Sequence, residues 1–139
     1  MITVEPKKIV RYGWLKGMYI WTILIAGFFG LGFLFAPVMV QTMMGYPTQD
    51  PILIGISASV YLAFAIVSIL GFLSPLKFVP VLLLQLCYKS IWFILVFLPA
   101  VIVGSVPSYG WMIAGIFATF IIGDLIAIPF QIVFKREPQ

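Results

Sequence analysis

Residues 52–73 read ILIGISASVYLAFAIVSILGFL, an unbroken apolar stretch without an acidic or basic residue. A helix rises about 1.5 Å per residue, so roughly 20 helical residues cross the hydrocarbon core of a bilayer. The apolar residues are continuous rather than alternating, which disfavours a strand of a membrane β-barrel. The stretch therefore predicts a transmembrane α-helix.

The rest of the chain has the same character. Three further apolar stretches cover residues 18–40, 79–103 and 110–134. Of the 139 residues 63% are hydrophobic and 9% are charged, with a mean hydropathy of +1.20, whereas an ordinary soluble domain has roughly 25% charged residues. No linker-like segment divides the chain. We predict one domain over residues 1–139, an all-α bundle of four transmembrane helices.

Short polar segments separate the predicted helices. Asp50-Pro51 is typical of a helix start, with an aspartate N-cap and a proline in the first turn. The connections at residues 74–78 and 104–109 are short, which favours antiparallel neighbours and an up-down-up-down topology. Residues 6–17 are expected to form a short helix at the membrane interface.

The distribution of charge predicts the orientation. Basic residues gather before the first span, in the second connection and after the fourth span: Lys7, Lys8, Arg11, Lys16, Lys77, Lys135 and Arg136. The positive-inside rule therefore places the N- and C-termini in the cytoplasm. The net charge of +4 is explained by anionic lipid headgroups, and no nucleic-acid partner is expected. We predict a multi-pass protein of the bacterial inner (plasma) membrane.

Two ionisable residues fall deep within the predicted spans. Lys89 lies ten residues from the start of its span at residue 79, and Asp124 lies ten residues from the end of its span at residue 134. Both would lie about 15 Å from the cytoplasmic end. A lone charge at that depth costs at least about 2.5–3.5 kcal/mol. We therefore predict a buried Lys89–Asp124 ion pair.

Polar and aromatic residues near this pair are candidates for a pocket lining: Tyr61, Gln85, Tyr88, Trp92 and Gln131. Two interpretations of the cluster stay open. The ion pair fixes the register of the last two helices, or it belongs to a ligand or proton site, since intramembrane ionisable residues often mark such sites.

Small residues indicate close helix contacts. Glycines cluster in the first span at positions 27, 30 and 32, and Gly115, Thr119 and Gly123 repeat every fourth residue in the fourth span. Such residues let helix backbones approach each other in membranes.

The sequence lacks the residues that metal sites, haem sites and common catalytic sites require. The sequence has no histidine, four acidic residues and one cysteine, Cys87. The usual metal and haem ligand sets, a CxxC pair and a Ser-His dyad therefore cannot be assembled. We expect no metal, no cofactor and no enzymatic activity.

The order of features resembles that of small four-helix bacterial membrane proteins of the DoxX-like type. The resemblance is carried by IAGFFGLGFL at residues 25–34, a following proline, MGYP at residues 44–47 and LGF at residues 70–72. It implies a four-helix membrane fold, in a group that includes membrane subunits of redox or quinone-linked systems. The chain lacks the acidic residue common in the second helix of that type, and no functional residue is carried over.

Three hypotheses for function remain. The first is a non-catalytic accessory or scaffold subunit, organised by the Lys89–Asp124 pair and partnered by another membrane protein or a second copy. The second is an intramembrane binder or carrier of a small amphipathic molecule, a quinone or a lipid. The third is a proton-coupled transporter, which the lack of repeats and broken helices disfavours. A cavity that reaches Lys89 would favour binding, and tight packing around the pair would favour a scaffold.

Overall fold

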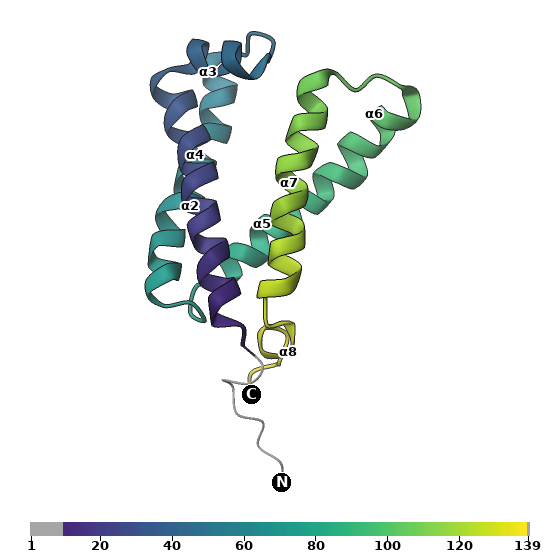
Figure 1. Ribbon diagram of the computed structural model, residues 1–139. Helices are drawn as coiled ribbons and strands as arrows, with labels where there is room; N and C mark the ends of the chain where they lie inside the picture. Colours follow the sequence, from purple (N-terminus) through teal and green to yellow (C-terminus); the bar gives the residue numbers. More distant parts are fainter. Residues whose placement is uncertain (1–9, 139) are drawn as a thin grey trace.

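The computed structural model describes residues 10–138, and all regular elements in this part of the chain are helices (Figure 1). Four helices are long and apolar enough to cross a membrane: α2 (Tyr12–Phe35), α4 (Pro51–Leu73), the continuous helix Val79–Val103 and α7 (Ser108–Ala127). Two short helices, α3 (Pro37–Met44) and α8 (Phe130–Val133), follow α2 and α7. The prediction of an all-helical chain with four apolar helices is confirmed.

The first long helix differs from its predicted bounds of 18–40. It begins at Tyr12 and ends at Phe35, because Pro37 pushes the residue before it out of the helical region. Ala36 accordingly has φ −141° and ψ 58°, and Pro37 then begins α3. The predicted interfacial helix at residues 6–17 lies partly outside the described residues, and its last six positions, 12–17, belong to α2.

The fourth long helix ends earlier than the predicted bounds of 110–134. Its last helical residue is Ala127, and Ile128 is extended with φ −70° and ψ 123°. The cause is again the following proline, Pro129, which disfavours the helical region for the residue before it. The Arg11 Nη1 atom donates a hydrogen bond of 3.1 Å to the Ile126 carbonyl at this end, where a cation is favourable. Asp124 therefore lies in the last turn of α7.

The start of α4 is capped as the sequence predicts. The Asp50 side chain accepts hydrogen bonds from the backbone N–H groups of Ile52 at 2.9 Å and Leu53 at 3.1 Å. Pro51 occupies the first turn, where it has no hydrogen bond to lose. The helix begins at Pro51 and ends at Leu73, against a predicted range of 52–73.

The third long helix changes its hydrogen-bonding pattern midway. It consists of α5 (Val79–Trp92), the π-helical segment η1 (Phe93–Phe97) and α6 (Leu98–Val103). The Leu98 N–H bonds to the Phe93 carbonyl five residues earlier. Pro99 lacks an N–H group and its ring crowds the preceding turn, so the wider π turn accommodates it without ending the helix.

Helix α2 contacts two other long helices, α4 and α7. It packs along α4 and against α7, while α5 packs against α7 (Figure 1). The helix formed by α5 and α6 slopes away from α2 and α4 in this view. The main apolar core gathers where α2 and α5 begin and α7 ends: Val10, Leu15, Met18, Tyr19, Val79, Leu82, Phe120, Ala127 and Ile128. A second, smaller apolar core toward the other end of α2 contains Phe33, Val40 and Ala58.

Gly30 marks a close approach between the backbones of α2 and α4. A Cβ atom at this position would lie 2.7 Å from the Leu62 backbone N and 3.0 Å from the Ala58 carbonyl oxygen. Those neighbours are backbone atoms, which cannot turn aside as a side chain would. The glycine predicted to permit close helix contact at residue 30 does so.

The substitution Gly30→Ala is expected to separate α2 from α4 and to destabilise the protein by roughly 1–3 kcal/mol, the usual range for overpacking. Gly17→Ala is a matched control on the same helix, because a Cβ there meets nothing within 4 Å. The free energy of unfolding of both variants would be measured in mixed micelles. Equal stability of Gly30→Ala and Gly17→Ala would contradict the close approach.

Candidate ligand-binding cavity

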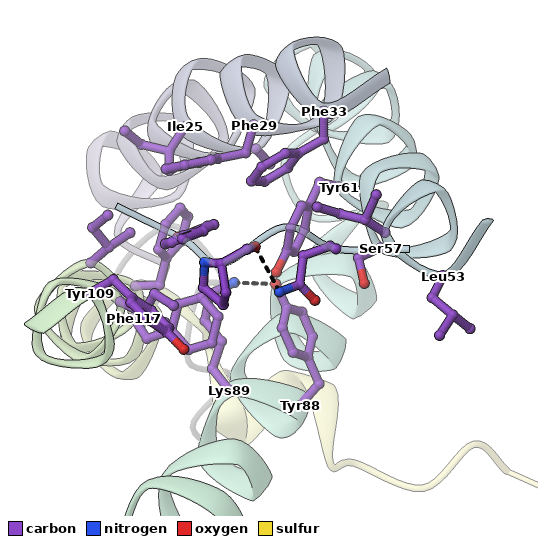
Figure 2. A pocket seen from close by; sticks show the side chains of 18 residues that line it. Ile25, Phe29, Phe33, Leu53, Ser57, Tyr61, Tyr88, Lys89, Tyr109 and Phe117 are labelled. Carbon is purple, nitrogen blue, oxygen red and sulfur yellow. Dashed lines mark hydrogen bonds between the residues drawn. The ribbon is translucent and has the colours of Figure 1, made fainter. Parts of the chain in front are cut away.

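A cavity of about 440 Å³ lies between α2, α4, α5 and α7 (Figure 2). Helix α2 and the connection after α3 supply Ile25, Ala26, Phe29, Phe33, Tyr46, Pro47 and Gln49. Helices α4 and α5 supply Leu53, Ile54, Ser57, Tyr61, Tyr88 and Lys89. Helix α7 supplies Tyr109, Ile113, Ile116, Phe117 and Phe120. Its size and its largely apolar and aromatic lining, with few polar groups, are typical of small-molecule sites.

Figure 2 shows how the walls face one another. The side chains of Phe29 and Phe33 extend from α2 toward the interior, and Tyr61 enters from α4. Tyr88 and Lys89 lie on the α5 side, across the cavity from α2. Lys89 thus lies in a cavity whose walls come from α2, α4, α5 and α7.

The Lys89 ammonium group is held by aromatic residues. Its Nζ atom donates a hydrogen bond of 2.6 Å to the Tyr88 hydroxyl. It also lies over three rings, 4.3 Å from the centroid of Tyr88, 5.0 Å from Phe117 and 4.2 Å from Phe120. Ring faces attract a cation electrostatically, and the attraction is larger when the group is shielded from water. Lys89 is 3% exposed.

Asp124 is bound by a different residue, Gln85. The Gln85 Nε2 atom lies 3.1 Å and 3.3 Å from the two carboxylate oxygens and 3.2 Å from the Thr22 hydroxyl oxygen. The Thr22 hydroxyl donates to the Met18 carbonyl at 2.8 Å. Thr22, Gln85 and Asp124 are all buried, so this network joins α2, α5 and α7 inside the protein.

The direct Lys89–Asp124 ion pair expected from the sequence is not formed between these two residues, both of which the structure describes. The reason is the early end of α7 at Ala127. The predicted depth of Asp124, measured from residue 134, was an overestimate. The Asp124 carboxylate lies level with Gln85 instead, one helical turn from Lys89. Lys89 instead faces Phe120, one turn from Asp124.

The other predicted pocket residues separate into two groups. Tyr61 and Tyr88 line the cavity, while Gln85 belongs to the network with Asp124. Trp92 packs behind the wall, with its ring centroid 5.1 Å from that of Phe117. Gln131 lies in α8 and is exposed. The structure therefore brings some of the predicted residues together and places Trp92 and Gln131 elsewhere.

Thr22 and the aromatic residues at the far end of the cavity were missed by the sequence analysis. Thr22 is the one serine or threonine within α2, and a small hydroxyl side chain in an otherwise apolar stretch is the signal that could have identified it. Tyr46 packs its ring 5.2 Å from that of Tyr109 and 6.0 Å from that of Phe33. Burial, followed by the neighbouring Tyr61 and Tyr109, raises the pKa of Tyr46 to about 12, so its phenol stays protonated.

No metal-ligand group of three or more His, Cys, Asp or Glu residues is found within residues 10–138. Comparison of the chain with protein-family models, curated proteins and solved structures finds no match. The DoxX-like resemblance stays a prediction.

Double-mutant cycles would show which residue holds Asp124. We expect Gln85→Leu and Asp124→Leu to be coupled by roughly 0.5–3 kcal/mol in unfolding free energy, because each change strands the other's buried polar group. The matched cycle with Lys89→Met and Asp124→Leu should give a clearly smaller coupling. A larger coupling in the Lys89 cycle would restore the direct ion pair.

Proposed function

We propose that the protein is a multi-pass membrane protein that binds a small amphipathic molecule in the cavity between its helices, without catalysing a reaction. The observation that carries this proposal is the cavity of about 440 Å³ that reaches the buried Lys89. Its apolar walls suit the body of such a ligand. Among its few polar groups, those of Ser57, Tyr61, Tyr88 and Lys89 suit a polar head.

Binding is better supported than the scaffold hypothesis. A scaffold held by a direct Lys89–Asp124 pair requires those side chains to meet, and they bind Tyr88 and Gln85 instead. The Gln85 network can fix the helix register by itself. A lysine that serves only packing would not need to line a cavity, since a buried charge costs at least about 2.5–3.5 kcal/mol in a membrane.

The proposal includes an orientation in the bacterial inner membrane. Both termini lie in the cytoplasm, as the loop charges indicate, and the four helices form an up-down-up-down bundle. The cavity end that carries Tyr46, Gln49 and Tyr109 then faces away from the cytoplasm. Lys89 lies at the deeper end, where a ligand head would be shielded from water.

Filling the cavity is expected to abolish binding. Ala26 lines the cavity on α2, so Ala26→Trp should occupy the ligand's space and lower retention of bound small molecules at least about tenfold. Leu24→Trp is the matched control, because Leu24 is on the same helix, is 59% exposed and does not line the cavity. Native mass spectrometry of each variant, released from its own membranes, would count the retained molecules.

The comparison between the two tryptophan variants decides the result. Adducts present on the unmodified protein and on Leu24→Trp, and absent from Ala26→Trp, support the proposal. Identical adducts on both variants, or none on the unmodified protein, would contradict binding in this cavity.

A further inference from the structure

The Lys89 ammonium group has hydrogen-bonding capacity that the protein leaves unused. An ammonium group offers three N–H donors. Within residues 10–138, one acceptor is found for them, the Tyr88 hydroxyl oxygen at 2.6 Å. The surrounding rings of Phe117 and Phe120 attract the charge but provide no oxygen acceptor. The remaining donors are available to an acceptor inside the cavity that Lys89 lines.

The carboxylates that the structure describes are engaged or placed elsewhere. Gln85 binds both oxygens of Asp124. Asp50 caps the start of α4, and Glu137 is exposed beyond α8. The other groups that line the cavity are neutral apolar, aromatic, hydroxyl and amide side chains. The cavity thus contains one cationic group without an anion in direct contact.

From this arrangement we infer that the ligand is a small amphipathic acid, whose single anionic oxygen head binds Lys89 and whose apolar body packs against the aromatic walls. The inference rests on the proposed binding function and narrows its ligand class. Hydrogen bonds between an ammonium group and an anion are roughly twice as strong as those between neutral groups. A neutral head, such as a hydroxyl or a quinone carbonyl, accepts a hydrogen bond without neutralising the charge.

The depth of Lys89 makes the distinction between acid and neutral ligand large. The residue is 3% exposed and lies against Tyr88, Phe117 and Phe120. Aromatic walls keep the local dielectric constant low, so the attraction between unlike charges is less screened than in water. Lys89 is the one charged side chain among the lining residues, whereas the hydroxyl groups of Ser57, Tyr61 and Tyr88 can donate to the acid and to a neutral head alike. Selectivity for the acid should therefore depend on this one side chain.

Decanoate and decanol are a probe pair that differs in the head group. The full chain in phosphatidylcholine nanodiscs would be equilibrated with each radiolabelled probe, at a pH where decanoate is ionised, with empty nanodiscs as the blank. We expect decanoate to bind at least about tenfold more tightly than decanol. Lys89→Met should lower decanoate affinity at least about tenfold and decanol affinity clearly less, because the alcohol loses only a hydrogen bond to a neutral head. Lys77→Met removes an exposed lysine outside the cavity and should change neither affinity.

The outcomes separate the ligand class from the binding function. Retained decanol binding by Lys89→Met shows that this variant is folded. Equal affinity for the two probes, both abolished by Ala26→Trp, would overturn the inference about the acid and leave the proposed function standing. Absence of binding by either probe, or binding unaffected by Ala26→Trp, would overturn both. Loss of both probes in Lys89→Met, with an unchanged unfolding transition, would also overturn the inference.

Discussion

Hydrocarbon offers no hydrogen-bond partner, so a strongly polar side chain between membrane-spanning helices is stabilised by partners inside the protein. The hydrogen bonds from Gln85 to Asp124 and Thr22 are the main instance of this constraint here. They connect α2, α5 and α7 at the end that holds the larger of the two apolar cores. Because Gln85 satisfies the carboxylate, Lys89 has no direct ionic partner and lines the cavity instead. The properties of the candidate site follow from that division of partners.

The sequence predicted those features of the fold that the surrounding lipid determines, namely the apolar helices of membrane-spanning length. The stretch at residues 52–73 had to be a helix of membrane-spanning length, because lipid provides no other solution for the backbone. The Asp50-Pro51 pair indicated where this helix begins. The bounds at the two prolines were wrong. Hydropathy continues through Pro37 and Pro129, whereas the backbone before each proline leaves the helical region. Apolar composition specifies membrane depth but not where a helix ends.

The candidate site shows the same limit. The early end of α7 moves Asp124 by about two turns relative to the predicted helix end, which replaces the expected partner Lys89 with Gln85. Helix rotation also decided which aromatic residues reach the cavity, so Tyr88 lines it while Trp92 packs behind Phe117. Rotation depends on packing between helices, including the approach of α2 to α4 at Gly30. Spacing along a single chain does not specify it, because nearly every face of these helices is apolar.

Distances between side-chain nitrogens and the Asp124 carboxyl carbon, measured by magic-angle-spinning NMR in lipid bilayers, test the central claim most directly. The account predicts that the Gln85 amide nitrogen is hydrogen-bonded to the carboxylate, about 3 Å from its oxygens, and is therefore the side-chain nitrogen nearest to the carboxyl carbon. The Lys89 nitrogen should lie farther from that carbon. A Lys89 nitrogen in direct contact with the carboxylate, with Gln85 displaced, would contradict it.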